Sequence, residues 1–306
     1  MLVRVCVPAS TSNLGPGFDC LGLALDLHLI LEASAAGDGL RIEATGPEAA
    51  QIPVDSTNLV YASLSRVLRS AGKPSRGLSL RVTSDIPLGR GLGSSGAAIL
   101  AGIVAGHLLA GQAEPDRDTV LREAFEIEGH PDNVAASLLG GLVACALEGD
   151  RVLSVRLPFP ADLIVLLVVP EYQVATEAAR LLLPRTVPLA DAVFDLSHLA
   201  LLIGGLCRDD LELLRAAMQD RLHQEHRLGL VPGLGAALAA LREERGCLAA
   251  AVSGAGPTLF ALRRDAGSDA GAAAVDELRR HGVRAQARVL RPDLRGATWE
   301  RLAQSA

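Results

Sequence analysis

The chain has 306 residues, of which 49% are hydrophobic but only 3% aromatic, so a sizeable core can form and must be built from Ala, Leu and Val. Its formal net charge of −6 argues against a general nucleic-acid binder, because contact with nucleic-acid phosphates needs a basic surface. The basic side chains are almost all arginine, since Lys73 is the only lysine, so an anion-binding site must use a few local groups.

The N-terminal segment joins a strand to a polar loop. Residues 2–7 alternate and are rich in β-branched side chains, which predicts a strand, and residues 8–18 form a loop of Ser, Thr, Asn, Gly and Pro. Asn13 and Asp19 are short polar side chains in a stretch bracketed by glycines. They could face a cleft and bind an amino or hydroxyl group, or they could simply form turns.

Strands and helices then mix along the first half of the chain. The spacing of apolar residues predicts strands over residues 21–31, 40–44 and 77–83, and helices over residues 58–71, 97–109 and 119–127. A glycine-rich loop at residues 86–95 comes directly before the strongly apolar helix over 97–109.

This glycine-rich loop has the composition of a phosphate-binding loop. It runs Pro87-Leu88-Gly89-Arg90-Gly91-Leu92-Gly93-Ser94-Ser95-Gly96-Ala97. Glycines let the backbone curl close to a ligand, the two serines add hydroxyl groups, and the next helix points its unpaired N–H groups at the loop. The plain structural alternative is a glycine turn capped by Ser95.

Three well-known glycine loops fit this segment poorly. Gly91, Gly93 and Gly96 match the G-x-G-x-x-G dinucleotide fingerprint, but the acidic residue expected about 20 positions later falls at Glu114 or Asp116, where no strand ends. A Walker loop needs a Gly-Lys pair, and a protein-kinase loop needs a lysine on the following strand together with H-R-D and D-F-G. What remains is P-x-G-x-G-L-G-S-S without a lysine.

A second chemically rich segment precedes a short helix predicted over residues 134–138. Glu128-Gly129-His130-Pro131-Asp132-Asn133 brings two carboxylates, an imidazole and an amide together. Asp132 or Asn133 could simply cap the helix. The functional interpretation is that Glu128 binds Mg²⁺, which favours oxygen ligands, while Asp132 and Asn133 contact a reacting hydroxyl group.

The remaining elements form a second domain. A hairpin is predicted over residues 141–148 and 151–157, and Pro158 and Pro160 follow it, so we place a domain boundary near residue 158, between domains 1–158 and 159–306. Beyond it the expected helices cover residues 176–183, 196–207, 210–219, 234–245 and 271–281. The expected strands cover residues 163–169, 249–253, 258–262 and 284–289, the last of the chain. The fold class is α+β.

The second half also carries candidate binding groups. Thr176 and Arg180 lie on one helical face at i and i+4, and Arg227 precedes a Pro-Gly pair, although single arginines are most often solvated surface residues. Ser253-Gly254-Ala255-Gly256-Pro257-Thr258 joins two strands and could be a simple glycine turn. H-x-x-H at residues 223–226 has no convincing third ligand, so we expect no zinc site there.

No segment indicates secretion or membrane insertion. The N-terminus is too short in apolar length for a signal peptide, and the apolar run at residues 163–169 stops at Pro170, far below the roughly 20 residues of a membrane helix. The five cysteines include no C-x-x-C pair, which is typical of buried thiols in a reducing compartment. We expect a soluble cytoplasmic protein that binds neither membrane nor nucleic acid.

Taken in order, these segments resemble the motifs of the GHMP kinase family, which includes galactokinase and the homoserine, mevalonate and phosphomevalonate kinases. The glycine-rich loop is similar to the second family motif, with Gly96 where alanine is usual, and residues 253–258 are similar to the third, S-G-S-G-P-T, with Ala255 replacing a serine. Residues 8–19 resemble the P-A-S-x-x-N-x-G-x-G-F-D motif of homoserine kinases. E-G-H-P-D-N-V-A, T-x-x-A-R and R-x-x-L-x-P-G also resemble that branch, so the resemblance runs from about residue 3 to 263.

The resemblance implies an architecture and a reaction. The N-terminal domain should be like domain 2 of ribosomal protein S5, and the C-terminal domain should be ferredoxin-like. The implied reaction transfers a phosphoryl group from ATP, with Mg²⁺, to the hydroxyl group of L-homoserine, a step toward threonine. Homodimers are usual in the family, so a homodimer is expected.

The resemblance also implies roles for individual residues. ATP would be bound by residues 87–97, Mg²⁺ by Ser95 and Glu128, and the reacting hydroxyl group by Asp132 and Asn133, while whether Asp132 is a true general base is left open. The substrate-binding residues would be Asn13, Asp19, His130, Asp132, Asn133, Thr176, Arg180 and Arg227.

Two alternatives remain at this point. One is another GHMP kinase that phosphorylates mevalonate or a related polyol. The other is a non-catalytic sensor that binds ATP on the same fold without turnover. The joint presence of Ser95, Glu128 and Asp132 argues against the sensor.

Overall fold

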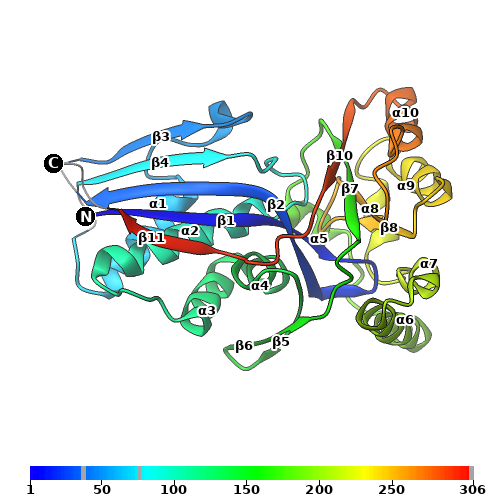
Figure 1. Ribbon diagram of the computed structural model, residues 1–306, viewed down its shortest axis with the longest axis horizontal. Coiled ribbons are helices and arrows are strands. Elements are labelled where there is room, and N and C mark those ends of the chain that lie inside the picture. Colours follow the sequence, from blue (N-terminus) through cyan, green and yellow to red (C-terminus); the bar gives the residue numbers. More distant parts are fainter. Residues whose placement is uncertain (36–38, 75–76, 303–306) are drawn as a thin grey trace.

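The structure is a computed structural model that describes residues 1–35, 39–74 and 77–302. Its strands form two sheets (Figure 1). A seven-stranded sheet has the order β11-β1-β2-β4-β3, with β5 paired to β2 and β6 to β5, and a four-stranded sheet has the order β10-β7-β9-β8.

The strands of the first sheet are β1 (Leu2–Asn13), β2 (Gly17–Ala35), β3 (Arg41–Thr45), β4 (Leu78–Ser84), β5 (Leu142–Glu148), β6 (Arg151–Leu157) and β11 (Thr298–Leu302). Those of the second are β7 (Ile164–Pro170), β8 (Ala249–Val252), β9 (Leu259–Arg263) and β10 (Ala285–Leu290). Pairing is antiparallel except between β3 and β4, which are joined through α1. The long strand β2 pairs with β4 near one end and with β5 near the other.

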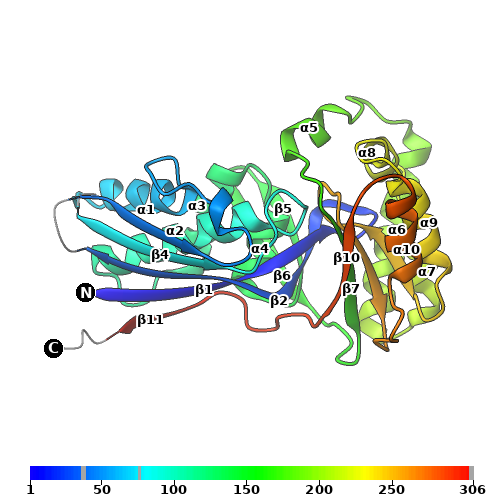
Figure 2. The same cartoon turned by 90° about the horizontal axis from the view of Figure 1, so that it is seen from above.

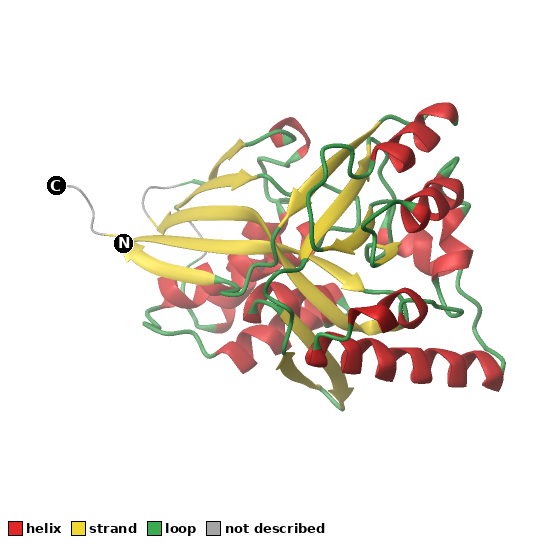
Figure 3. Cartoon of the chain, turned by 45° about the vertical axis from the view of Figure 1, so that its right-hand side comes forward, coloured by secondary structure: helices red, strands yellow, loops and turns green. Residues whose placement is uncertain are grey.

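The helices lie in two groups. The first group covers one face of the first sheet (Figure 2) and comprises α1 (Leu59–Ser70), α2 (Ser94–Ala110), α3 (Arg117–Glu128) and α4 (Asp132–Leu139). The second group lies beside the second sheet (Figure 1; all helices are red in Figure 3) and comprises α5 (Thr176–Leu181), α6 (Leu189–Arg208), α7 (Leu214–Ala217), α8 (Gln224–Leu228), α9 (Leu234–Glu243) and α10 (Ala272–Arg280). Short 3₁₀ turns occupy Ala49–Gln51 and Leu211–Leu213.

Strand β7 ties the two halves together because both of its faces are buried. Val165 and Leu167 point into the core that continues beneath the first sheet, whereas Leu166 and Val168 point into a second core with residues of α9 and α10. A strand buried on both faces needs a continuous apolar sequence, which explains the unbroken run at residues 163–169. The cleft between the two sheets is therefore held by shared packing.

Helix α2 is apolar on all sides because it lies inside the first domain. Its glycines permit close contact with α1: a Cβ atom at Gly102 would lie 2.4 Å from the backbone oxygen of Val60, and one at Gly106 would lie 2.7 Å from Val67 Cβ. This tight packing against α1 fixes the position of α2, whose N-terminus directly follows the glycine-rich loop.

Most predicted elements are present, but the loop expected at residues 8–18 is wrong for residues 8–13, which continue strand β1, and for residues 17–18, which begin β2. The polar side chains that suggested a loop are buried and satisfied by distant partners: Ser10 Oγ lies 2.9 Å from Asn133 Oδ1, and Ser253 Oγ lies 2.8 Å from Thr11 Oγ1. Buried polar groups are tolerated when they are hydrogen-bonded, and these partners lie more than 100 positions away in the sequence.

Two further expectations differ from the structure. The strand at 284–289 is not the last, because β11 returns to pair with β1 at the edge of the first sheet. The helix expected at 210–219 is a 3₁₀ turn followed by the short α7, and α8 was not predicted. The boundary near residue 158 stays a prediction, although β11 lies far beyond it and belongs to the first sheet.

Helix α6 is the one described helix long and apolar enough by composition to cross a membrane, a property that helices of soluble proteins can share. It packs against α7, its Leu202 and Leu206 are buried in the hydrophobic core, and its buried Asp195 accepts a hydrogen bond from the backbone N–H of Arg221 at 3.0 Å. These contacts account for one face of the helix within the fold.

Candidate active site

A cavity of about 200 Å³ lies where the glycine-rich loop, the β1–β2 turn, the α3–α4 connection, α5, α8 and the turn after β8 converge. The predicted site residues that line it are Asn13, Asp19, Gly89, Arg90, Gly91, Gly93, Ser94, Ser95, Glu128, His130, Asp132, Asn133, Thr176, Arg180 and Arg227. Pro87, Leu88, Leu92, Gly96 and Ala97 of the predicted ATP loop do not line this cavity. Residues separated by more than 200 positions thus share one pocket.

The glycine-rich loop adopts a backbone that glycine favours. Gly89, Gly91 and Gly93 have φ values of 64°, 75° and 70°. A Cβ atom at Gly91 would lie 2.2 Å from the backbone oxygen of Ser253, whose hydroxyl group donates to the Gly91 carbonyl at 2.6 Å. The turn at residues 253–258 therefore packs directly against the glycine-rich loop. The two backbones come so close that only glycine fits at position 91.

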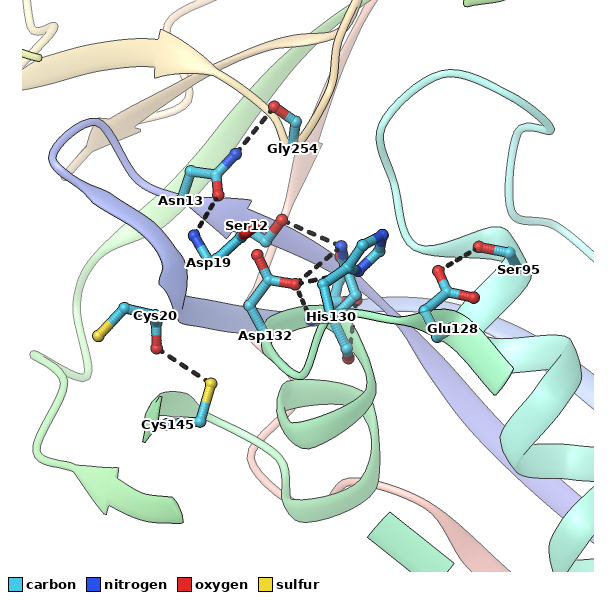
Figure 4. A network of polar contacts seen from close by, with 12 residues as sticks. Ser12, Asn13, Asp19, Cys20, Ser95, Glu128, His130, Asp132, Cys145 and Gly254 are labelled. Atoms are coloured by element: carbon cyan, nitrogen blue, oxygen red, sulfur yellow. Dashed lines mark hydrogen bonds and ion pairs between the residues drawn. The ribbon is translucent and has the colours of Figure 1, made fainter. Parts of the chain in front are cut away.

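The N-terminus of α2 is left open toward the cavity. Its N-cap is Gly93, without a side-chain capping bond, so the alternative in which Ser95 caps the helix is wrong. The Ser95 hydroxyl group instead donates to Glu128 Oε1 at 2.6 Å (Figure 4). Unpaired N–H groups at the start of a 17-residue helix favour an anion.

Ser95 and Glu128 provide two adjacent oxygen ligands from α2 and α3. Mg²⁺ prefers oxygen ligands and usually binds one or two protein groups together with water and substrate phosphates. This pair fits such a partial ligand set beside the glycine-rich loop, and the assignment stays a prediction.

Glu48, which was not predicted, holds the glycine-rich loop in place by hydrogen bonds from a separate segment of the chain. Its Oε2 accepts a hydrogen bond from the backbone N–H of Leu88 at 2.7 Å, and its Oε1 pairs with the Arg90 guanidinium. Arg90 Nε in turn donates to the Pro170 carbonyl at 2.9 Å. Glu48 lies 40 positions before the loop in a polar turn, where nothing in the local sequence distinguishes it from a solvated carboxylate.

The β1–β2 turn stores backbone strain at the site. Asn13, Leu14 and Asp19 have positive φ values of 70°, 48° and 53°. Asn13 Nδ2 donates to the Gly254 carbonyl at 3.0 Å, and its Oδ1 accepts the backbone N–H of Asp19 at 3.1 Å (Figure 4). Such conformations cost free energy and tend to persist at ligand sites, where surrounding contacts impose them.

The α3–α4 connection presents Asp132 and His130 to the cavity. Asp132 is 2% exposed, begins α4 and lies 3.6 Å from His130 Nδ1, an ion-pair distance. Burial alone would lower the pKa of His130, but Asp132, followed by Glu128, raises that pKa above its usual value. The N-cap is Pro131, so the structural alternative in which Asp132 or Asn133 caps α4 is wrong.

Asn133 is already engaged by strand β1. Its Oδ1 accepts from Ser10 at 2.9 Å, and its Nδ2 donates to Ser12 Oγ at 3.0 Å. The Asn133 amide thus has a protein partner at each end, and direct contact of Asn133 with a substrate hydroxyl group stays a prediction.

Two arginines from the second domain complete the cavity. Arg180 donates to both carboxylate oxygens of Asp19, at 3.0 and 2.5 Å. Arg227 is 2% exposed, and burial, followed by repulsion from Arg180, lowers its pKa to about 10. Its Nη1 donates to the Gly254 carbonyl at 3.0 Å, while its Nε has no acceptor among the described residues. A buried cation with a spare donor is suited to an anionic ligand.

Phe18 and His223 pack against these arginines without lining the cavity themselves, and neither was predicted. The guanidinium carbons of Arg180 and Arg227 lie 5.5 and 5.3 Å from the centre of the Phe18 ring, and the His223 ring stacks on it at 5.1 Å. Phe18 stands inside the G-F-D motif, which could have indicated it. His223 drew attention only as half of a rejected zinc motif.

A second, mainly apolar cavity of about 220 Å³ adjoins the glycine-rich loop. Ser94 and Ser95 line both cavities, and the second cavity is also bounded by Ile52, Leu59 and Leu88. An apolar slot beside a loop that is predicted to bind phosphate has the character expected of a nucleobase pocket.

The environment of Cys20 and Cys145, the thiols near the cavity, disfavours the reactive thiolate form. Cys145 and Cys247 are buried, the other three are half-buried, and all five are free thiols. Burial raises the pKa of Cys20 and of Cys145, whose Sγ donates to the Cys20 carbonyl at 3.2 Å. These thiols near the cavity are therefore held protonated, which disfavours a nucleophilic role.

Comparison with known proteins places this site in a family. The model of the GHMP kinases N-terminal domain matches residues 58–141, and that of the GHMP kinases C-terminal domain matches residues 202–284. The chain is 41% identical to a homoserine kinase of Desulfitobacterium hafniense, over 97% of this chain and 99% of that protein. It is 46% identical to a homoserine kinase of Streptomyces avermitilis, over 87% of each chain.

Solved structures agree with this assignment. The crystal structure of a homoserine kinase from Cytophaga hutchinsonii matches with a TM-score of 0.82 at 30% identity, covering 98% of this chain and 97% of that one. L. major mevalonate kinase, solved with R-mevalonate, shares the fold with a TM-score of 0.69 at 18% identity, covering 94% and 95%. The predicted two-domain α+β architecture is confirmed, and the chain belongs to the GHMP kinase family.

Proposed function

We propose that this chain is an ATP-dependent homoserine kinase, which phosphorylates the hydroxyl group of L-homoserine to give O-phospho-L-homoserine in threonine biosynthesis. The observation that carries the proposal is the joining in one cavity of an open helix N-terminus with a pair of arginines and two carboxylates. The first feature suits a triphosphate, and the second suits a small amino acid.

The nucleotide side is formed by the first domain. The N–H groups at the start of α2 and the glycine-rich loop hold the phosphates, with the Ser94 hydroxyl group beside them, and the adjoining apolar slot takes the base. Ser95 and Glu128 are the residues that would hold Mg²⁺, which when bound supplies positive charge to the phosphate oxygens.

The acceptor side is formed by groups from both domains. Homoserine carries a carboxylate and an ammonium group, and Arg227 and Arg180 suit the first while Asp19 suits the second. Asp19 and Arg180 form an ion pair with each other in the structure. Homoserine therefore binds to both members of this pair, with its ammonium group at Asp19 and its carboxylate at Arg180. Asn13, His130 and Thr176 bound the same space and orient the substrate.

The chemical step then depends mainly on alignment. Phosphoryl transfer asks the protein to bring the acceptor oxygen into line and to neutralise developing charge. Asp132 accepts a hydrogen bond from the homoserine hydroxyl group, and His130 lies beside it with a raised pKa, which favours the protonated form that offsets the charge of the carboxylate.

The deciding experiment is a coupled assay of ADP release with ATP, Mg²⁺ and a panel of L-homoserine, mevalonate and galactose. We expect ADP formation with L-homoserine only, and a large rise in the homoserine KM when Arg180 is replaced by Gln. ATP binding without turnover on any acceptor would favour the sensor, and preference for mevalonate would favour the other kinase class.

Two assignments about the protein's setting also remain proposals. The chain acts in the cytoplasm as a soluble enzyme, without a nucleic-acid or membrane partner, and it forms a homodimer as family members usually do. Sedimentation velocity of the purified chain tests the dimer, since a single monomer boundary at micromolar concentration would contradict it.

A further inference from the structure

His223 stands between the two domains behind the acceptor side of the cavity. The side chain is fully buried and immediately precedes α8. Its Nε2 lies 2.8 Å from the Gly15 carbonyl in the β1–β2 turn, and its Nδ1 lies 3.2 Å from Arg227 Nη1. A single ring therefore contacts the strained turn and the buried arginine at once.

The partners determine which nitrogen of His223 carries the proton. A carbonyl oxygen only accepts hydrogen bonds, so Nε2 must be protonated, and a guanidinium only donates, so Nδ1 must be free. The ring is therefore neutral. Burial lowers the pKa of His223, and Arg227 acts in the same direction against the opposing charge of Asp220.

The segment that carries both residues is firmly anchored. Asp220 accepts backbone N–H groups from residues 222–224, at 2.9 Å from Leu222 and 2.7 Å from Gln224. Gln224 Oε1 accepts the N–H of Val252 in β8 at 2.8 Å. These bonds hold the backbone of α8 without the His223 side chain. The imidazole is therefore not needed to anchor the helix and can act as a hydrogen-bond partner of the Arg227 guanidinium.

The position of Arg227 Nη1 is set by two acceptors, the Gly254 carbonyl and His223 Nδ1. With Nη1 held, the rotation of the guanidinium is fixed, and its Nε–H keeps no acceptor within the described residues. Arg227 is buried and lines the cavity, so the orientation of its guanidinium determines which of its N–H groups face a substrate carboxylate.

We propose that His223 is a positioning residue for the acceptor: its neutral ring holds the Arg227 guanidinium in the orientation that selects an alcohol bearing a carboxylate. This inference rests on the proposed function, because it assigns the acceptor's carboxylate to Arg227. It predicts an effect confined to acceptor binding.

Three substitutions separate the contacts of the ring. His223→Asn keeps an acceptor near the Nδ1 position, His223→Gln keeps a donor near the Nε2 position, and His223→Leu keeps neither. In the Leu and Gln variants the charged Arg227 guanidinium loses the acceptor that His223 Nδ1 provides. This loss should raise the homoserine KM by about 10- to 100-fold. The Asn variant should recover most of that loss, and the ATP KM should stay within about twofold in all three.

His107→Leu is the matched control. His107 is a similarly buried histidine in α2 that pairs with Glu123 at 2.8 Å, away from the cavity lining. Its loss should lower the melting temperature without raising the homoserine KM. If His223→Leu does not fold, the comparison of the Gln and Asn variants still decides.

The proposal is overturned if the His223 variants lose melting temperature while their homoserine KM stays at the wild-type value. It is equally overturned if the homoserine and ATP KM values rise together, or if Asn is no better than Gln. Failure of the proposed function is a different result, because the wild-type chain itself would then show no homoserine-dependent ADP release.

Discussion

Asp132 is the carboxylate best placed to meet the substrate hydroxyl group, and its contacts argue for positioning. Its Oδ1 already accepts the backbone N–H of Asn133 at 2.7 Å and lies near His130. A carboxylate held in this way can accept a hydrogen bond from the alcohol without taking the proton before transfer. The structure contains no lysine in the cavity lining that would tune Asp132 as a base.

We expect Asp132→Asn to lower kcat modestly, by less than about 100-fold, because an amide oxygen can still accept the hydroxyl hydrogen bond. Steady-state kinetics with both substrates measure this, with the melting temperature as a check on folding. A loss of more than about 1,000-fold with unchanged homoserine binding would show that Asp132 is a general base.

Glu128→Gln tests the metal assignment. The substitution keeps the size of the side chain but removes its charge, so we expect the half-saturating free Mg²⁺ concentration to rise about tenfold, equivalent to about 1.4 kcal/mol. Initial rates across a Mg²⁺ titration at fixed ATP give the result. Glu126→Gln is the control on the same helix, since Glu126 pairs with Arg66 and Arg122 outside the cavity lining. Identical Mg²⁺ curves for the two variants would contradict the assignment.

Individual site residues could be predicted from the sequence where they belong to compact motifs. Asn13, Glu128 and Asp132 could be chosen because each stands in a short stretch dense in polar groups and glycine. Glu48 could not, because it contacts the glycine-rich loop 40 positions away, and His223 could not, because its contact with Gly15 spans 208 positions and its H-x-x-H pattern suggested only a zinc site without further ligands. Polar side chains in ordinary surroundings are mostly solvated, so their selection required the fold.

Among the elements, the glycine-rich loop makes the sharpest prediction. Gly91→Ala should impair the nucleotide site, because its positive φ is unfavourable for alanine and its Cβ would meet the Ser253 carbonyl at 2.2 Å. We expect at least a tenfold rise in the ATP KM with little change in the homoserine KM.

Gly72→Ala is the control that separates the backbone strain at a positive φ from the steric clash of an added Cβ atom. Gly72 has a φ of 65°, close to that of Gly91, but a Cβ atom added there would have nothing within 4 Å. This variant should lose about 1–2 kcal/mol of stability and keep the wild-type ATP KM. If Gly91→Ala behaves like Gly72→Ala in both measurements, the loop does not depend on its contact with Ser253.

Elements were predictable where local pattern and burial agree. The apolar run of β7 and the periodicity of α1 predicted both elements to within two residues. Strand β1 was cut short because buried Ser10 and Thr11 look like loop residues until their partners from α4 and the turn after β8 are in place. Strand β11 depends on pairing with β1, nearly 300 positions earlier, which no local pattern reports.

For the whole molecule, the active site exists because two domains share a core through β7. The glycine-rich loop lies in the first domain and Arg227, on α8, lies in the second. The contacts from Arg90 to Pro170 and from His223 to Gly15 cross between these domains. The sequence order of motifs predicted that these segments meet, through family resemblance. The convergence itself follows from the long-range pairing of the sheets and could not be derived from local propensity.

A buried carboxyl pair in the second domain makes the stability of the whole molecule depend on pH. Asp195 of α6 is 3% exposed, and burial, followed by its neighbour Asp220, raises the pKa of Asp195 to about 7. In the unfolded chain the same group has a pKa near 3.9. Between these values the folded state holds a proton that the unfolded state has lost, so stability falls as pH rises from about 4 to about 7 and then levels off.

Asp195→Asn removes this titration while keeping an oxygen that can accept the N–H of Arg221. We therefore expect the variant to melt above the wild type by an amount that grows between pH 5 and pH 7.5, reaching on the order of 5 °C. Calorimetric melting temperatures at several pH values measure the difference. Asp276→Asn, an exposed aspartate paired with Arg279 on α10, should follow the wild-type curve throughout. If the Asp195→Asn curve runs parallel to the wild type across this range, Asp195 is ionised in the folded protein and the carboxyl pair does not govern its acid–base stability.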